Sequence, residues 1–239
     1  MKKGNTILSV KNLSVSFNGK EKILDDVNFE VKEGENLIIM GPNGAGKSVL
    51  LKTLLGLIPY KGEVKWKDGI KIGYVPQRFS PEKRFPLNVE EFFKFKKITR
   101  EKIKEALASV GLHDEVILKR TIGEISSGQM QRVLIAWSLV SKPDVLLFDE
   151  PTAGIDIGGE ETVYKLLSNI EKEKDLTIIF VTHDLSIIHK LADSVLCLNK
   201  KMVCYGGLSE LGESDVFEKL YGHEVKVYKH THDSEPVSK

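Results

Sequence analysis

A glycine-rich loop near the start of the chain most constrains its fold. The apolar segment Asn36–Met40 leads directly into GPNGAGKS, residues 41–48, and a helical pattern over 46–57 follows. Glycines let backbone amides turn toward phosphate oxygens, and the start of a helix adds partial positive charge. The order strand–loop–helix predicts a phosphate-binding loop, in which Lys47 reaches the β- and γ-phosphates of a nucleotide and Ser48 binds Mg²⁺. The alternative, a glycine-rich turn with an incidental Lys-Ser pair, does not explain these flanks.

Two carboxylates end a second apolar segment, VLLFDE, at residues 145–150. A buried strand of this kind ends at the carboxyl edge of a parallel sheet, where ligands bind in such folds. Asp149 is expected in the Mg²⁺ shell, and Glu150 is expected to orient and deprotonate an attacking water. An acidic pair that only solvates a turn is the alternative. His183 ends the next apolar segment, TIIFVTHD, and is expected either near the γ-phosphate or in a structural role.

Further apolar segments alternate with helical patterns along the chain. Most of these segments are continuously apolar, which predicts strands buried on both faces of a largely parallel sheet with crossover helices. The first 30 or so residues alternate instead, and Asn18-Gly19 supplies a hairpin turn signal. Strands are expected at 36–40, 71–75, 145–148, 177–182 and 194–198, and helices at 46–57, 89–97, 100–110, 128–140, 159–172, 185–191 and 214–221.

Composition and charge exclude several classes of function. The chain has 35 Lys+Arg against 34 Asp+Glu, so no global basic field indicates a nucleic-acid binder. The amino end lacks the apolar core of a signal peptide, and no apolar run approaches the roughly 18–20 residues of a membrane-spanning helix. Cys197 and Cys204 have neither metal-binding nor redox spacing, and we expect them to be core residues of a cytoplasmic protein.

The segment EISSGQMQRV, residues 124–133, places small polar residues ahead of an apolar helical run. Ser126 and Gln129 have the spacing of a capping box, in which the two side chains satisfy unpaired amides at a helix start. That role is sufficient for the segment taken alone. Whether the segment has a second role depends on the rest of the chain.

Together these motifs resemble the ATP-binding cassette (ABC) ATPases, and the resemblance runs from Ile7 to about Tyr221. It implies ATP hydrolysis with Mg²⁺ and gives each motif a role. By resemblance, Phe17 stacks on adenine, and the nucleotide is bound by Gly41, Pro42, Asn43, Gly44, Ala45, Gly46, Lys47, Ser48 and Val49. The Mg²⁺ ligands implied are Ser48, Asp149 and Gln77 of YVPQ, and the catalytic residues are Glu150, His183 and Gln77. The signature consists of Ser126, Ser127, Gly128 and Gln129, and Asp156 lies in the D-loop.

The resemblance also implies the architecture. The expected fold is α/β of the P-loop NTPase (RecA-like) type, in one ABC ATPase domain over 1–239. A mostly parallel core is expected at 36–79 and 141–222, a largely antiparallel β subdomain at 1–35, a helical signature subdomain at 80–140 and a mobile tail at 223–239.

The partners expected from the resemblance are a second copy of the chain and a separate multi-span membrane permease, with no nucleic acid. In this family the signature of one subunit closes over the γ-phosphate held by another, so a homodimer is expected on ATP binding. The helical insertion after Gln77 is expected to contact the permease at the cytoplasmic face of the membrane. Two departures stand out, Ile125 and Ser127 in place of Leu and Gly in the usual Leu-Ser-Gly-Gly-Gln, and Ala-Gly-Ile-Asp at 153–156 in place of Ser-Ala-Leu-Asp.

Some segments resemble one branch of the family. YVPQRFSPEKRFPLNVEEF and DSVLCLNKKMVCYG resemble the ATPase subunits of bacterial zinc and manganese importers, which work with an extracytoplasmic metal-binding protein, and the ending YKHTHD resembles the zinc-uptake members. Import of zinc, or of manganese, is the leading expectation. A regulatory cassette that controls protein partners and an importer ATPase for another small solute, such as an iron chelate, are the alternatives.

The tail carries a separate candidate site for metal. His230, His232 and Asp233 are possible zinc ligands, since short His-rich tracts bind metal. The alternative is a solvated end, because His-x-His lacks the four converging ligands of a structural zinc site. Ligands from a second tail or from the permease would complete such a site and make the tail a zinc sensor.

Overall fold

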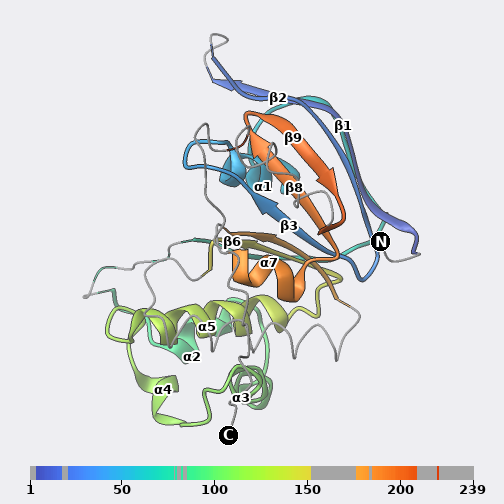
Figure 1. Ribbon diagram of the computed structural model, residues 1–239. Coiled ribbons are helices and arrows are strands. Elements are labelled where there is room, and N and C mark those ends of the chain that lie inside the picture. The colour runs from blue at the N-terminus through green and yellow to red at the C-terminus, as the bar shows by residue number, and fades with distance from the viewer. Residues whose placement is uncertain are drawn as a thin grey trace, which may run out of the picture.

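The structure is a computed structural model that describes residues 4–17, 21–77, 79, 82, 85–151, 176–182, 185–208 and 220. Figure 1 shows a small sheet above a larger one, with a group of helices below the larger sheet. The fold agrees with the expected P-loop NTPase architecture. The helices expected at 159–172 and 214–221, and the turn at Asn18-Gly19, lie wholly or almost wholly outside the described residues.

The small sheet is antiparallel, with strand order β2-β1-β4. Its strands are β1 (Thr6–Phe17), β2 (Glu21–Lys32) and β4 (Lys61–Trp66). Alternating side chains of β1 and β2 are buried, as expected where one face of a sheet packs on a core. The strand β4 is a correction to the expected division at residue 35, because it comes from the range assigned to the parallel core and instead pairs with β1.

The large sheet has six described strands in the order β5-β6-β7-β3-β8-β9. All neighbours are parallel except β8 and β9, which form an antiparallel pair. Every residue of β3, β6 and β7 is buried, which explains their continuously apolar sequences. The strands are β3 (Asn36–Met40), β5 (Ile72–Val75), β6 (Val145–Asp149), β7 (Thr177–Val181), β8 (Ser194–Asn199) and β9 (Lys201–Gly206).

The described helices contribute to the cores on both faces of the large sheet. They are α1 (Lys47–Leu54), α2 (Val89–Lys94), α3 (Arg100–Ser109), α4 (Val116–Lys119), α5 (Ser127–Leu139) and α7 (Leu185–Leu191). A capping box starts α2, in which Asn88 accepts from the Glu91 amide and Glu91 accepts from the Asn88 amide. The short α4 and the strands β4 and β9 were not among the sequence-based expectations.

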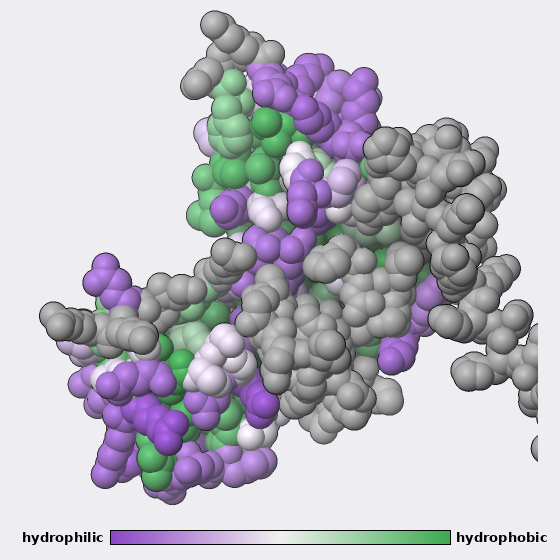
Figure 2. Space-filling view, turned by 60° about the vertical axis from the view of Figure 1, so that its left-hand side comes forward, coloured by the Kyte–Doolittle hydropathy of each residue, from purple (hydrophilic) through white to green (hydrophobic). Residues whose placement is uncertain are grey.

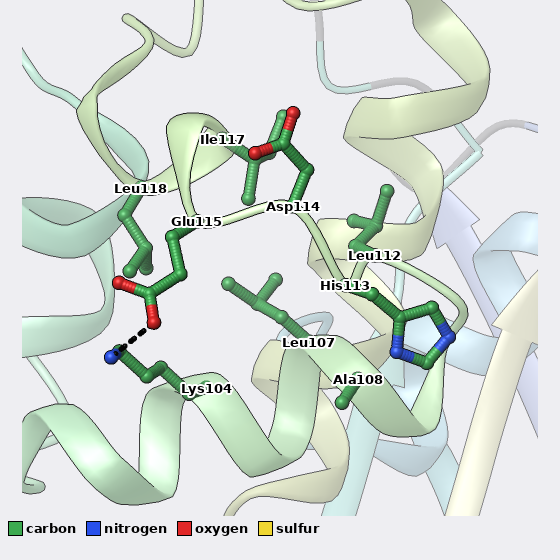
Figure 3. Close-up of a pocket in the computed structure, with 9 residues that line it drawn as sticks. All are labelled: Lys104, Leu107, Ala108, Leu112, His113, Asp114, Glu115, Ile117 and Leu118. Atoms are coloured by element: carbon green, nitrogen blue, oxygen red, sulfur yellow. Dashed lines mark hydrogen bonds and ion pairs between the residues drawn. The ribbon is translucent and has the colours of Figure 1, made fainter.

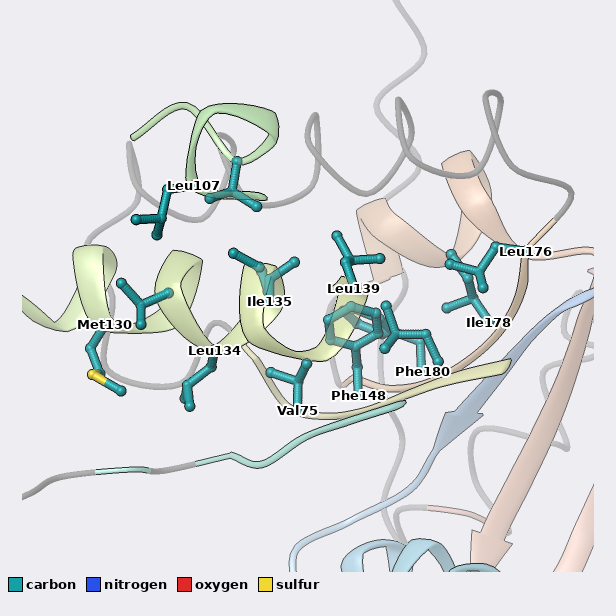
Figure 4. Close-up of a cluster of buried hydrophobic side chains, with 14 of the residues drawn as sticks. Val75, Leu107, Met130, Leu134, Ile135, Leu139, Phe148, Leu176, Ile178 and Phe180 are labelled. Carbon is teal, nitrogen blue, oxygen red and sulfur yellow. The ribbon is translucent and has the colours of Figure 1, made fainter. Parts of the chain in front are cut away.

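Two hydrophobic cores lie on opposite faces of the large sheet. One fills the space between the two sheets and includes Leu50, Leu51 and Leu54 of α1. The other packs the helices beneath the sheet, as Figure 4 shows for Ile135 of α5 and Phe148 of β6 among others. The described parallel strands are therefore held in place from both faces of the sheet, up to their carboxyl ends.

The two cysteines correct a sequence-based expectation. Cys197 is fully buried in the core as expected, whereas Cys204 is only partly buried, and the two form a disulfide between neighbouring strands although their spacing indicated no such pair. Their strands pair in antiparallel register at these two residues, which their sequence spacing does not reveal.

The surface carries several large apolar side chains. Figure 2 shows apolar and hydrophilic residues intermixed over the described part of one face. Among the described residues, the large apolar side chains that are exposed are Phe17, Leu57, Tyr60, Phe79, Phe85, Phe95, Val116 and Met202. Among the described helices, none is long and apolar enough to cross a membrane.

Candidate functional site

The phosphate loop joins β3 to α1 in a conformation that glycine permits. Gly44 and Gly46 have φ values of 80° and 97°, in the left-handed region. A Cβ atom at Gly46 would lie 2.7 Å from Cδ2 of Leu24 and 2.9 Å from the carbonyl oxygen of Ile23. The loop therefore needs glycine at 46 both for its backbone angles and for its close approach to β2.

Lys47 is the first residue of α1, and its side chain is buried against its own loop. Its ammonium donates to the carbonyl oxygens of Gly41 and Pro42 at 2.8 and 3.0 Å. It also lies 3.5 Å from Oε1 of Glu150, at the end of β6. The loop thus presents one buried cation beside a carboxylate, in the position from which a lysine can reach phosphate oxygens.

Ser48 and Asp149 meet across the two motifs. The Ser48 hydroxyl donates to Oδ1 of Asp149 at 2.9 Å. A hydroxyl oxygen and a carboxylate oxygen are ligands that Mg²⁺ prefers, so these two residues fit the expected metal. Burial, together with the nearby charge of Glu150, raises the pKa of Asp149, while the Ser48 hydrogen bond acts in the opposite direction. A divalent cation would offset this cost of keeping a buried carboxylate charged.

Glu150 is held in an unusual backbone conformation. Its φ is 45°, uncommon for a residue with a side chain, and its amide donates to the Val181 carbonyl at 3.2 Å. The Gln77 side chain donates from Nε2 to Oε2 of Glu150 at 2.8 Å. One carboxylate oxygen therefore faces Lys47 and the other is bound by Gln77, which fixes the orientation of the group. Such strain at a residue of expected function is typical of active sites.

The segment at 124–133 forms the capping box predicted from its spacing. The Gln129 amide donates to the Ser126 hydroxyl at 3.2 Å, and the Ser126 amide donates to Oε1 of Gln129 at 3.1 Å. Ser126 is the N-cap of α5, and both Ser126 and Ser127 are exposed, while Ile125 is buried. The helix start is thus accessible from outside the subunit, and the Ser127 side chain is exposed to solvent.

His183, Asp156 and the tail residues His230, His232 and Asp233 lie outside the described residues. Phe17 is described at the end of β1, where its side chain is 51% exposed, as a ring free to stack would be.

Tyr74 is a site residue that the sequence reasoning missed. It lies on β5, and its hydroxyl is 3.4 Å from Oδ2 of Asp149, the oxygen that Ser48 does not bind. Burial first, and then the charge of Asp149, raise the pKa of Tyr74 to about 12. Its position three residues before Gln77 was the available signal, but the contact depends on the pairing of β5 with β6.

A pocket in the helical subdomain is separate from these residues. It lies between α3 and α4, has an apolar floor that includes Leu107 and Leu118, and encloses about 160 Å³ (Figure 3). At its rim Lys104 and Glu115 form an ion pair of 2.5 Å. None of its lining residues was an expected site residue, and in the described part of the chain no cluster of three His, Cys, Asp or Glu side chains could hold a metal ion.

Comparisons with known proteins identify the family of the chain. The family model of the ABC transporter matches residues 24–153. The zinc import ATP-binding protein ZnuC of Photorhabdus laumondii is 36% identical over 95% of this chain and 90% of its own length. A solved metal-chelate type ABC transporter in an inward-facing conformation is 28% identical, with a TM-score of 0.79 over 91% of this chain and 89% of that one.

A dimeric bacterial ABC transporter cassette gives a TM-score of 0.73 at 28% identity, covering 84% of this chain and 98% of its own. The family match spans the phosphate loop, the signature segment and the acidic pair. The chain therefore belongs to the ABC transporter family, as an ATP-binding and ATP-hydrolysing subunit.

Proposed function

We propose that this ATPase powers the import of a divalent metal ion, zinc or else manganese, through a separate membrane permease. The observation that carries its enzymatic part is the convergence of Lys47, Ser48, Gln77, Asp149 and Glu150 at one edge of the large sheet. The choice of metal is supported by the zinc-import name of a relative that matches almost the whole chain.

The phosphate loop binds the triphosphate of ATP in this proposal. Lys47 carries the charge that meets the β- and γ-phosphates, and the loop amides and the start of α1 add donors. Ser48, Asp149 and Gln77 would hold Mg²⁺, which supplies positive charge to the phosphates when it is bound. The hydrogen bond between Ser48 and Asp149 already places two of these three side chains together.

Glu150 is the general base of the proposed reaction. Its carboxylate orients a water molecule for attack on the γ-phosphate and accepts the proton that the water loses. Gln77 holds one carboxylate oxygen at 2.8 Å and so limits the directions in which the base can point. His183 is proposed to contact the γ-phosphate.

Two copies of the chain are proposed to form each complete site. Ser126 and the Gly128 amide, at the accessible start of α5, would meet the γ-phosphate held by the other copy. Asp156 is proposed to lie in the D-loop near this interface. The likeness to a dimeric cassette supports the arrangement. Because Ser127 is exposed, its hydroxymethyl group can turn away from the nucleotide without a change in the core.

The segment after Gln77 is proposed to contact the permease at the cytoplasmic face of the membrane. Phe79, Phe85 and Phe95 from this part of the chain are exposed. Phe79 packs on Phe92 with ring centroids 5.9 Å apart, and Phe92 stacks on Trp137 at 5.5 Å. Phe92 and Trp137 are themselves partly buried against the core beneath the large sheet. Exposed aromatic side chains of this kind are typical of protein–protein interfaces.

A second cargo has a specific observation in its favour. One of the similar solved structures is a metal-chelate type transporter, so a chelated metal such as an iron complex is the second candidate. A regulatory cassette without transport remains the alternative of another class, and an intact Glu150 favours turnover over a purely regulatory role.

Transport by the assembled complex tests the proposal. The chain and its proposed permease would be reconstituted in liposomes, with the proposed extracytoplasmic metal-binding protein added outside. ATP-dependent uptake of zinc or manganese is the expected result, and Lys47→Ala is the matched control that should abolish it. Uptake of a metal chelate alone would favour the second cargo. ATP hydrolysis without uptake of any metal species would reject the import function.

A further inference from the structure

The turn between β8 and β9 lies beside the phosphate loop. Strand β8 runs parallel to β3, with Cys197 paired to Met40, the last residue of β3. Strand β8 continues to Asn199, so that Leu198 near its end lies next to Gly41, the first residue of the phosphate loop. The segment 198–200 is called the β8–β9 turn below.

Two contacts join the β8–β9 turn to the phosphate loop. The Lys200 amide donates to the carbonyl oxygen of Ala45 at 2.9 Å. The carbonyl oxygen of Leu198 lies so close to Gly41 that a Cβ atom there would overlap it. The turn therefore touches the loop near its first residue and again near its end.

The Ala45 contact determines the direction of a loop amide. In a trans peptide the carbonyl of one residue and the N–H of the next point in opposite directions. Because the Ala45 carbonyl is turned toward Lys200, the Gly46 N–H must point away from the β8–β9 turn. A phosphate loop works by the common direction of such amides, so the orientation of this peptide bears directly on phosphate binding.

Other contacts hold the β8–β9 turn itself in place. The Asp25 amide of β2 donates to the Lys200 carbonyl at 2.8 Å. Lys200 has a φ of 58°, in the left-handed region. In this conformation its N–H donates to Ala45 and its carbonyl accepts from Asp25. Side chains add two ion pairs, Lys200 with Glu21 at 2.8 Å and Lys201 with Asp25 at 3.2 Å. The turn is thus supported from β2 as well as from its own strands.

We propose that the β8–β9 turn is a positioning element of the nucleotide site, in which the Lys200 backbone amide sets the direction of the Ala45–Gly46 peptide and thereby the affinity of the loop for the phosphates of ATP. This inference rests on the phosphate-binding role proposed for the loop. Lys200 sets this direction through its backbone amide. Its side chain adds only the ion pair with Glu21, in which both side chains are largely exposed, and such surface pairs contribute little.

Backbone substitution at residue 200 tests the inference. Lys200→Pro removes the N–H donor and forces a φ near −65°, whereas Lys200→Gly keeps the donor and accepts a positive φ. Binding would be measured by titration calorimetry with a β,γ-imido analogue of ATP and with inorganic tripolyphosphate. We expect Lys200→Pro to lower the affinity for both ligands by about 2- to 10-fold, the usual effect of one hydrogen bond. Lys200→Gly should bind both ligands with the affinity of the parent.

A milder change covers the case in which the proline variant does not fold. The α-hydroxy acid analogue of lysine at position 200 replaces the amide N–H by an ester oxygen and leaves the side chain and turn angles unchanged. This ester variant should lower the affinity for both ligands to a similar extent. A lower melting temperature with unchanged affinities would assign residue 200 a structural role only and overturn the inference.

The two ligands separate the remaining outcomes. A loss confined to the ATP analogue, with tripolyphosphate unaffected, would place the effect at the base or ribose and contradict positioning of the phosphate loop. If the parent protein binds neither ligand, the proposed role of the loop itself fails and this inference fails with it. Equal binding by parent and ester variant contradicts the inference alone.

Discussion

The ammonium of Lys47 lies 3.5 Å from a carboxylate oxygen of Glu150, and both side chains are largely buried. The pair joins the phosphate loop to the end of β6, two motifs that are far apart in the sequence. Opposite charges at this distance offset part of the cost of removing each from water. Phosphate oxygens bound to Lys47 would compete with Glu150 for the same ammonium. We infer that nucleotide binding frees Oε1 of Glu150 for the attacking water, while Gln77 continues to hold Oε2.

The composite site proposed for the dimer predicts a result for mixed variants. Lys47→Ala damages the phosphate loop of its own chain, and Ser126→Arg damages the signature that serves the other chain. A mixed dimer therefore keeps one site with both halves intact. Crosslinking from a photoreactive ATP analogue should place the two regions on different chains at the same nucleotide. Labelling of both regions within an isolated monomer would contradict the model.

The environment of Tyr74 beside Asp149 predicts that the free energy of unfolding falls at alkaline pH. Burial raises the pKa of Tyr74 from 10.0 to about 12, so the folded protein holds this proton more tightly than the unfolded chain. The stability from this group is fully present below pH 10.0 and is lost as the pH rises toward about 12. Urea unfolding of Tyr74→Phe should therefore show a smaller loss of stability across this range. Parallel curves for parent and variant would contradict the assignment.

The bond between Cys197 and Cys204 predicts a stability that depends on reductant. The two residues are separated by 7 positions, and closure of so short a loop contributes about 2–3 kcal/mol in the chain-entropy model. Cys204→Ser should lower the free energy of unfolding by that amount, and dithiothreitol should lower that of the parent similarly. Cys204→Ser also serves as the control for the reductant, because dithiothreitol should leave its free energy of unfolding unchanged. A parent insensitive to reductant would show that the bond contributes nothing.

Much of the fold could be predicted from local sequence. The expected bounds 36–40 for β3 and 185–191 for α7 agree with the structure, because continuous apolar segments and helical periodicity were clear there. The strand β4 was missed because its sequence, KGEVKW, is mostly polar and only partly buried. What makes it a strand is its pairing with β1, a tertiary effect that local propensity does not contain.

The candidate site, like the fold, could be predicted only in part from local sequence. Motifs with a fixed spacing identified Lys47, Ser48 and the acidic pair, since each chemistry needs its residues on one turn or at one strand end. The contacts of Tyr74 with Asp149 and of Lys200 with Ala45 could not be found, because they arise from the pairing of β5 with β6 and of β3 with β8. The cysteine bond likewise depends on the register between β8 and β9.

The turnover of Glu150→Gln tests the central claim most directly. The substitution removes the basic carboxylate, keeps a side chain of the same shape and leaves Lys47 and Ser48 in place. We expect MgATP to bind with an affinity close to that of the parent and an ATP-bound dimer to accumulate, while steady-state hydrolysis falls by about 10²–10⁴, the usual contribution of a positioned general base. Hydrolysis within a few-fold of the parent rate, at equal ATP affinity, would contradict the role of Glu150 and with it the account of this site.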